Sequence, residues 1–242
     1  MLIFELLTSE WWLDAVLSVL YYCSHEIDPY KKPPELLEVS PKGLVPGLKL
    51  NTYDPPRALS ESTVILDFIQ DLAATTTQRS LLPPVSEPYA RALIRLQGDH
   101  VNRTLVPAFY RYIQAQDEEK QIQGGRDLVK AIEGLVHLFQ RAESETPAFA
   151  GLWVDGGTLT LSDVMVSPWL FRATNVLAHY RGFVLPEGPR FRAYVDRLLT
   201  HPTIKRTCST EQLYIDSYER YAHNRPNTSQ VANAINAGTA LP

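Results

Sequence analysis

A Val-Pro bond inside a short apolar run is the feature that most constrains how this chain can fold. The run from Leu44 to Leu50 predicts a strand, but Pro46 has no N–H and interrupts the ladder at that point. X-Pro bonds are also the bonds at which the cis form costs little, and such bonds lie in tight turns. We therefore predict a cis Val45–Pro46 bond at a sheet edge whose backbone is offered to a ligand.

A helix start follows this strand. Ser60-Glu61-Ser62 precedes a segment of periodic apolar residues, and the pattern predicts a helix from Ser62 to Ala74. The first turn of a helix has N–H groups that lack a partner within the helix, and such groups bind carboxylates. An interrupted sheet edge beside a helix N-terminus indicates a peptide-binding site.

The composition excludes several classes of partner. The chain has 242 residues, of which 45% are hydrophobic, enough for one large or two small domains with a buried core. Its net charge is −4, and no Lys/Arg cluster is interleaved with aromatic residues, so nucleic acid is not an expected partner. No apolar run reaches the ~18 residues that span a bilayer, so no membrane association is expected. The histidines lack metal-ligand spacing, and we predict no metal site.

The two cysteines bear on the compartment. Cys23 and Cys208 are too few for a disulfide framework, which favours a reducing environment. The apolar segment from Leu13 to Cys23 follows Glu5 and Glu10, not the basic residues that begin a signal peptide. We predict a cytoplasmic protein. We interpret Cys23 as a small core residue and Cys208 as an ordinary residue of a helical region.

Strand and helix signals alternate only in the first third of the chain. Strands are predicted at 1–6, 25–28, 44–50 and 57–59, and helices at 9–22, 33–37 and 62–74. Further helices are predicted at 89–116, with a bend at Pro107, and at 118–141, 161–180, 191–199 and 204–221. The order of 224–242 is left open. The fold class is therefore α+β, with an α/β domain at 1–76, a linker at 77–88 and an all-α domain at 89–242.

Several motifs follow one another along the chain: Asp28 to Pro33, Pro41 to Pro46 with Glu61-Ser62, Thr160 to Asp163, Pro168 to Arg172, and the closing segment Gln230 to Gly238. Taken in this order, they resemble the glutathione transferase family and especially the omega-like transferases of fungi. The resemblance covers about residues 24–242. It implies a thioredoxin-like domain that binds glutathione, a helical domain that forms the acceptor-substrate site, and a homodimer.

The resemblance places the glutathione site at Lys32, Val45, Pro46, Glu61 and Ser62. Val45 would offer its backbone N–H and C=O to the cysteinyl part, because Pro46 keeps them out of a ladder. Glu61 would pair with the γ-glutamyl ammonium, and Ser62 would hold the carboxylate of the same residue. Lys32 would lie near the glycine carboxylate. We expect Glu61 and Ser62 to face a cleft between the domains, although a Val-Pro bond or a Ser-Glu-Ser cap alone is common in other folds.

The catalytic residue is where the chain departs from the family. Omega transferases carry Cys-Pro at the N-terminus of the first helix, where the helix dipole lowers the thiol pKa, and this chain has no Cys-Pro. Either the segment has diverged, with Thr8 or Ser9 facing the thiol, or its first exon is missing or misjoined. Ser9 is the candidate catalytic residue, since its hydroxyl could donate to the glutathione thiolate. The alternative is that Ser9 only caps its own helix.

Three residues of the helical domain are candidates for the acceptor site. Trp169 and Arg172 are i, i+3 neighbours on one predicted helix face, and Tyr214 lies on a later helix. The resemblance places Arg172 and Tyr214 at second-site positions. An aromatic wall with one cation suits a flat apolar ligand with a polar handle. The alternative, favoured for Trp169, is ordinary helix packing.

These patterns predict a glutathione transferase that conjugates or transfers glutathione to small hydrophobic electrophiles, in detoxification or secondary metabolism. Glutathione is then the co-substrate. One alternative is an omega-type glutathionyl reductase or thioltransferase, which needs a nucleophilic cysteine that the expected position lacks. The other alternative is a non-catalytic protein that kept the fold and binds ligands.

Overall fold

The chain forms two compact units. The computed structural model describes residues 4–8, 22–28, 31–76 and 80–242. One unit comprises Met1–Leu81 with Arg206–Cys208, and the other comprises Leu82–Lys205 with Ser209–Pro242. The division between Leu81 and Leu82 falls inside the segment predicted as a linker.

The first unit is built on a four-stranded sheet with the order β2-β1-β3-β4. The strands are β1 (Phe4–Thr8), β2 (Tyr22–Glu26), β3 (Gly47–Leu50) and β4 (Arg57–Ser60). Strand β1 is parallel to β2 and antiparallel to β3, which is antiparallel to β4. All four predicted strands exist. The second begins at Tyr22 instead of His25, and the third begins after Pro46 because proline cannot join the ladder.

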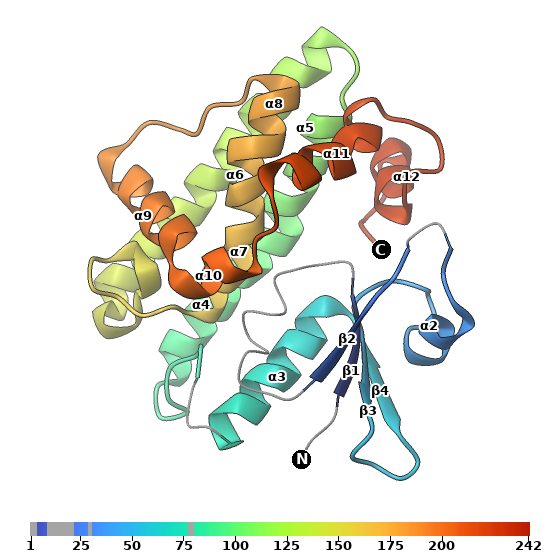
Figure 1. Cartoon of the computed structure of the whole chain (residues 1–242). Helices are drawn as coiled ribbons and strands as arrows, with labels where there is room; N and C mark the ends of the chain where they lie inside the picture. The colour runs from blue at the N-terminus through green and yellow to red at the C-terminus, as the bar shows by residue number, and fades with distance from the viewer. Residues whose placement is uncertain (1–3, 9–21, 29–30, 77–79) are drawn as a thin grey trace. The chain divides into compact units, whose positions relative to one another are not determined.

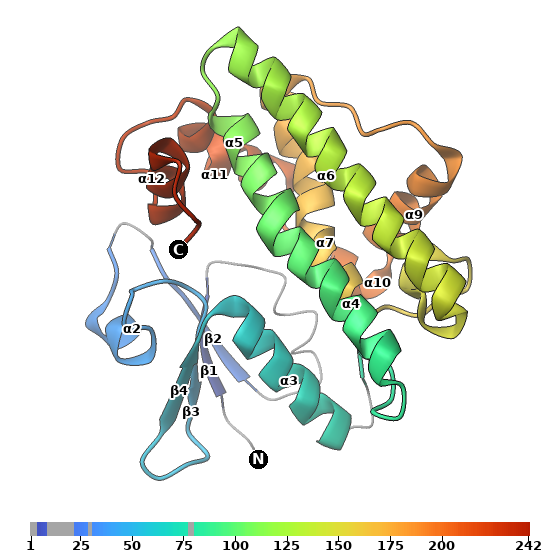
Figure 2. The same cartoon turned by 180° about the vertical axis from the view of Figure 1, so that it is seen from behind.

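Two described helices cover this sheet from opposite sides (Figures 1 and 2). Helix α2 (Pro34–Val39) buries Leu36 and Val39, and α3 (Ser62–Thr76) has its buried apolar face at Ile65, Leu66 and Ile69. A Cβ on Gly47 would lie 2.9 Å from the Val39 side chain, so only glycine lets α2 approach β3 this closely. The helix predicted from Ser9 lies outside the described residues, except that its last residue, Tyr22, belongs to β2.

The second unit is helical. Its elements up to α6 are α4 (Pro88–His100), the π-helical η1 (Val101–Leu105), α5 (Val106–Gln114) and α6 (Glu118–Glu145). Next come the 3₁₀ turns η2 (Pro147–Phe149) and η3 (Gly151–Trp153), then α7 (Leu161–Arg172), the π-helical η4 (Ala173–Leu177) and α8 (Ala178–Arg181). The remaining helices of the chain are α9 (Pro189–Thr200), α10 (Pro202–Thr207), α11 (Glu211–Ala222) and α12 (Gln230–Ala237), and the end of α10 belongs to the first unit.

The α4–η1–α5 segment runs alongside the long helix α6 (Figure 2). Gln97 donates to the Leu138 carbonyl at 3.4 Å, and His100 Nε2 lies 2.8 Å from the Ala131 carbonyl oxygen. Proline lacks the N–H that continues an α-helical ladder, and the π-helical interruption falls just before Pro107, where a bend was predicted. The core of this unit is rich in aromatic residues, and its largest fully buried side chains are Trp153, Tyr194, Phe109 and Phe139.

Helix α7 begins with the predicted capping box. The Thr160 side chain accepts from the Asp163 N–H, and Asp163 Oδ2 accepts from the Thr160 N–H at 2.9 Å. The same carboxylate accepts from the Leu152 N–H at 3.2 Å and the Tyr194 hydroxyl at 3.0 Å. Burial nevertheless raises the pKa of the Asp163 carboxyl. Further along α7, Pro168 leaves the Val164 carbonyl without its α-helical donor, and the Ser167 hydroxyl donates to it at 3.0 Å.

The end of the chain differs from the sequence expectation. One helix was predicted at 204–221, and this prediction is wrong, because α10 ends at Thr207 and α11 begins at Glu211. The Thr210 side chain accepts from the Leu213 N–H at 3.3 Å and so caps a new helix. The segment left open contains α12, which Ser229 caps and Gly238 ends at φ +66°.

Candidate functional site

Sheet register brings the two halves of the candidate site together. Gly47 pairs with Ser60 in the β3–β4 ladder, so the residues just before β3 lie alongside those just after β4. These are Val45-Pro46 and Glu61-Ser62. The Val45–Pro46 bond is cis, which confirms the prediction. Val45 lies outside the ladder and packs on the buried residues Ile27, Leu36 and Val39.

Glu61 occupies an uncommon backbone conformation. Its φ is +72°, in the left-handed region that non-glycine residues seldom enter. Its carbonyl accepts the first α3 hydrogen bond, from the Ile65 N–H at 3.0 Å, and Ser62 is the first residue of the helix. The prediction that this pair starts a helix is confirmed. Its position at a cleft between the domains stays a prediction. A strained residue at a helix start is typical of a site whose geometry is fixed for binding.

Lys42 lies next to the candidate site, and the sequence interpretation did not name it. Its Nζ lies 3.0 Å from Glu61 Oε1, and the two side chains remain 63% and 49% exposed. The only sequence signal is the place of Lys42 inside the Pro41 to Pro46 motif, since the two residues are separated by 19 positions. The carboxylate expected to pair with a ligand ammonium therefore already has one cationic neighbour.

Lys32 lies in the same region of the first unit. Its Nζ is 3.8 Å from the position that a Cβ on Gly43 would take, and Gly43 has a φ of +63°. Gly43 follows Lys42 directly, so two lysines flank the turn that leads into Val45. The region thus combines two ammonium groups, one carboxylate, a backbone segment outside the ladder and the N-terminus of α3. These groups are complementary to a short peptide that has two carboxylates and one amine.

Ser9, Thr8 and the two cysteines are the residues considered for catalysis. Ser9 lies outside the described residues, and Thr8 is the last residue of β1. Cys23 lies in β2, where its Cα pairs with that of Glu5, and nothing is described of its side chain. Cys208 lies between α10 and α11 and is partly exposed. The role of Ser9 therefore stays a prediction from sequence.

The three candidate acceptor-site residues lie together in the helical unit. The Arg172 guanidinium carbon is 5.2 Å from the Trp169 ring centroid and 5.3 Å from that of Tyr214. Arg172 and Tyr214 are only 5% and 8% exposed, and Arg172 Nη1 donates to the Pro168 carbonyl at 3.2 Å. Cation–π contacts of this kind are strengthened by burial. The contacts are those of helix packing, and a role in binding an acceptor stays a proposal.

Further aromatic residues join this cluster, and the sequence interpretation did not name them. Phe109 and Tyr110 lie edge-on to Trp169 at centroid distances of 5.5 and 5.7 Å. The Tyr218 ring centroid lies 5.7 Å from the Arg172 guanidinium carbon. The i, i+4 spacing of Tyr214 and Tyr218 on α11 was the available signal, because it places both rings on one helix face.

Two surface pockets of the helical unit are lined by other residues. One, of about 440 Å³, lies where α5, α6 and α12 meet, beside Gln114, Lys120 and Ile235. The other, of about 320 Å³, lies between α6 and the segment before α9, beside His137 and Phe191. Within the described part of the chain, no three His, Cys, Asp or Glu side chains gather as metal ligands. None of the helices in that part is both long and apolar enough to cross a bilayer.

Comparison with known proteins identifies the family. The family model described as "Glutathione S-transferase, N-terminal domain" matches residues 12–72, and "Glutathione S-transferase, C-terminal domain" matches residues 114–197. The glutathione S-transferase DHAR2 of Arabidopsis thaliana is 22% identical over 201 residues, which are 83% of this chain and 82% of that protein. The maleylacetoacetate isomerase maiA of Aspergillus fumigatus is 25% identical over 177 residues, 72% of this chain and 71% of that protein.

Comparison with solved structures points to the same family. Glutathione transferase Omega 3C from Trametes versicolor is 30% identical, covers 91% of both chains and has a TM-score of 0.73. Rice GST1 in complex with glutathione is 24% identical, covers 89% of this chain and 94% of that chain, and has a TM-score of 0.72. The chain belongs to the glutathione S-transferase family, whose co-substrate is glutathione. Its N-terminal domain is thioredoxin-like, its C-terminal domain is helical, and it shows an omega-like resemblance.

Proposed function

We propose that this transferase binds glutathione at the end of its sheet and transfers it to small hydrophobic electrophiles. The observation that carries the proposal is the Gly47–Ser60 register, which sets Val45 beside a Glu61 held at φ +72°. A backbone edge, a carboxylate and a helix start then converge on one ligand. Each of these groups has a partner in glutathione.

The proposed contacts follow from the chemistry of the tripeptide. The Val45 backbone pairs with the cysteinyl part, and Glu61 pairs with the γ-glutamyl ammonium. Ser62 and the first N–H groups of α3 hold the γ-glutamyl carboxylate, because helix N-termini favour anions. Lys32 holds the glycine carboxylate at the other end. This order fixes where the sulfur lies, since the cysteine stands between the two held ends.

The acceptor site and the nucleophile complete the proposal. The Trp169, Arg172 and Tyr214 cluster is proposed to bind a flat aromatic acceptor. Ser9 is proposed to donate to the glutathione thiolate and so favour its ionisation. A hydroxyl cannot form a mixed disulfide, so we expect weak conjugating activity and little thioltransferase activity.

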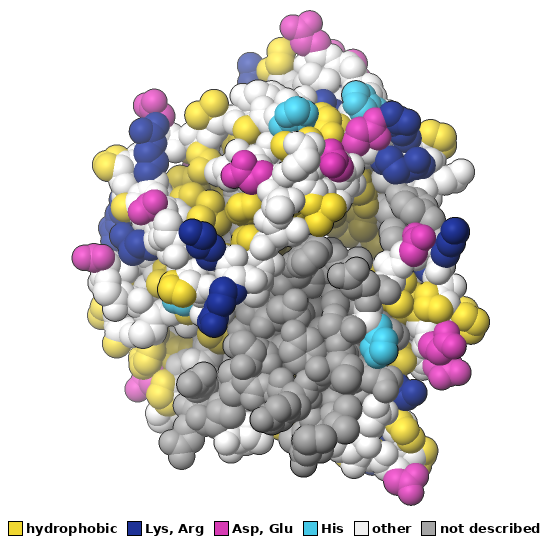
Figure 3. Space-filling view, in the orientation of Figure 1, with side chains coloured by type: hydrophobic (Ala, Val, Ile, Leu, Met, Phe, Trp, Pro, Cys, Tyr) yellow, Lys and Arg dark blue, Asp and Glu magenta, His cyan; other side chains and the backbone are white. Residues whose placement is uncertain are grey.

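The cellular role is proposed from the same features. Acidic and basic side chains are interspersed on the face drawn in Figure 3, and they form no basic stripe among the residues described there. Such a surface favours small molecules over nucleic acid as partners. We propose a cytoplasmic homodimer that acts in detoxification or secondary metabolism.

Calorimetric titration with glutathione tests the binding half. Glu61→Ala and the more conservative Glu61→Gln should each weaken binding more than about tenfold, because a charge-assisted contact is lost. Glu38→Ala, an exposed carboxylate on α2, is the matched control and should bind like the unchanged protein. Equal glutathione affinity of the unchanged protein and the three variants would contradict the proposed site.

Turnover tests the chemical half. The unchanged protein should conjugate glutathione to a generic aromatic halide, and Ser9→Ala should lower that rate without changing glutathione affinity. A glutathione adduct on Cys23 after incubation with oxidised glutathione would instead support the thioltransferase alternative. Tight glutathione binding with no turnover of any acceptor would support the non-catalytic alternative.

A further inference from the structure

The Lys42–Glu61 ion pair lies at the candidate glutathione site and is open to solvent. Lys42 Nζ is 3.0 Å from Glu61 Oε1, with side chains 63% and 49% exposed. The pair joins the turn before β3 to the start of α3. Since the pair is exposed, it contributes little to the stability of the fold. Both charges are therefore accessible to a ligand at the candidate site.

Left-handed backbone lies next to one partner of this pair and at the other. Gly43, next to Lys42, has a φ of +63°, and Glu61 has a φ of +72°. The Lys42 ammonium and the Glu61 carboxylate meet across 19 positions of sequence. A left-handed conformation is uncommon for a glutamate, because its Cβ crowds the carbonyl oxygen. The turn and the helix start thus place opposite charges side by side.

An adjacent cation and anion are complementary to a zwitterion. The γ-glutamyl end of glutathione carries an ammonium and a carboxylate on one carbon atom. Glu61 alone is attractive only to the ammonium, and it also attracts amines that lack the carboxylate. A carboxylate has two oxygens, so Glu61 can keep Lys42 on one oxygen and receive the ligand ammonium on the other. The Lys42 ammonium has three donors, so it can also face the ligand carboxylate.

We propose that Lys42 is a specificity residue that binds the α-carboxylate of the γ-glutamyl end, while Glu61 binds its ammonium. The inference rests on the proposed glutathione site and assigns to Lys42 a role that Ser62 and the α3 N-terminus do not fill alone. Lys32 serves the opposite end of the tripeptide. The Lys42–Glu61 pair therefore selects ligands that begin with an intact α-amino acid over amines and over acids.

Calorimetry with two ligands and two variants tests this role. The ligands are glutathione and 4-aminobutyryl-cysteinyl-glycine, which keeps the amine and lacks the α-carboxylate. The variants are Lys42→Met and, as a control for net charge, Lys31→Met, an exposed lysine beside the same region. Each titration is run at low and at high salt.

The Lys42→Met variant should bind glutathione about threefold to tenfold more weakly than the unchanged protein. It should bind the decarboxylated analogue with the same or a higher affinity. The loss should shrink at high salt, because the contact is exposed and screened. Lys31→Met should bind both ligands like the unchanged protein. Equal weakening of both ligands by Lys42→Met overturns the inference, since Lys42 would then act only by positioning Glu61. Tighter glutathione binding also overturns it, since Lys42 would then only compete for Glu61.

The same titrations separate this inference from the function on which it rests. If the unchanged protein shows no binding of glutathione at millimolar concentration, the proposed function fails and the inference fails with it. A second outcome is that the unchanged protein binds glutathione and that Glu61→Gln weakens this binding while Lys42→Met does not. In that case only the inference fails.

Discussion

At the scale of single residues, Arg181 shows how one cation can join several helix ends. Its guanidinium donates to the carbonyls of Tyr112 at 3.2 Å, Ala115 at 3.0 Å and Ala222 at 2.7 Å, and also to that of Ile113. The last carbonyls of a helix lack partners within it and carry the negative end of its dipole. Arg181 thus satisfies the ends of α5 and α11 at once. Burial lowers the pKa of Arg181.

Arg181→Met should lower the free energy of unfolding by about 1.5–3 kcal/mol, because carbonyls at two helix ends lose their hydrogen bonds to a charged donor. Urea denaturation followed by circular dichroism measures this change. The matched control is Arg95→Met, since Arg95 is exposed on α4, and its effect should lie within about 0.5 kcal/mol. Equal stability of the two variants would show that water replaces the guanidinium at these helix ends.

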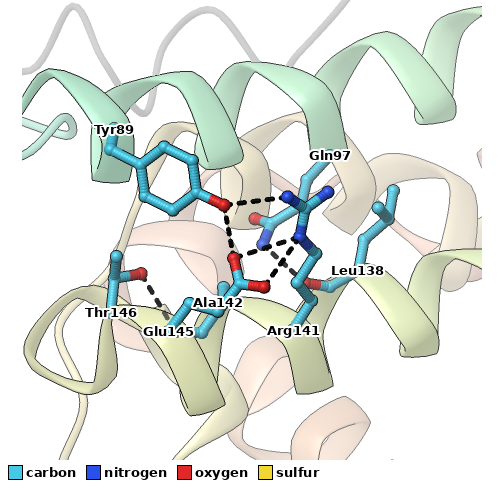
Figure 4. A network of polar contacts seen from close by, with 7 residues as sticks. All are labelled: Tyr89, Gln97, Leu138, Arg141, Ala142, Glu145 and Thr146. Carbon is cyan, nitrogen blue, oxygen red and sulfur yellow. Dashed lines mark hydrogen bonds and ion pairs between the residues drawn. The ribbon is translucent and has the colours of Figure 1, made fainter.

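At the scale of elements, α4 is tied to α6 by a polar network at the surface (Figure 4). The Tyr89 hydroxyl donates to Glu145 Oε2 at 2.5 Å, and Arg141 donates to the Tyr89 oxygen at 2.8 Å and to Glu145. The Tyr89 hydrogen bond, followed by that from Arg141, lowers the pKa of Glu145 below its ordinary value of 4.5. A carboxyl group with a lowered folded-state pKa stabilises the protein above its unfolded-state pKa and loses this effect as pH falls.

Tyr89→Phe should therefore lower the melting temperature at pH 7 slightly, and this difference should disappear as pH falls below 4.5 through the pKa of folded Glu145. Melting curves of both proteins between pH 3 and pH 7 would measure this effect. Because the network is exposed, salt should reduce the difference at neutral pH. A difference that persists undiminished at pH 3 would mean that Tyr89 acts through packing alone.

The elements also show what sequence patterns can predict. Strands β3 and β4, helix α3 and the capping box of α7 were predicted because turn and cap residues mark their ends locally. The break at Cys208 was missed because Cys208-Ser209-Thr210 interrupts a helical pattern without glycine or proline. At the site, Glu61 and Val45 were found from their motif. Lys42 was not assigned, since only the sheet register brings it to Glu61.

At the scale of the whole molecule, we expect a homodimer, because the family resemblance implies pairing of the small domain of one subunit with the helical domain of the other. Twofold pairing is also the commonest closed symmetry. Each unit exposes large apolar side chains that such pairing could cover, including Val64 on α3, 49% exposed, and Leu96 on α4, 41% exposed.

Light scattering at micromolar concentration should give a mass of about 55 kDa, twice the 27.3 kDa of one chain. Val64→Glu and Leu96→Glu should each shift the mass toward that of one chain, because a charge buried without a partner destabilises an interface. Leu213→Glu, at a residue 43% exposed on α11, is the control and should keep the mass of the pair. A single-chain mass for the unchanged protein would contradict the expected assembly. It would leave the glutathione proposal untouched, since every residue named for that ligand's contacts comes from one chain.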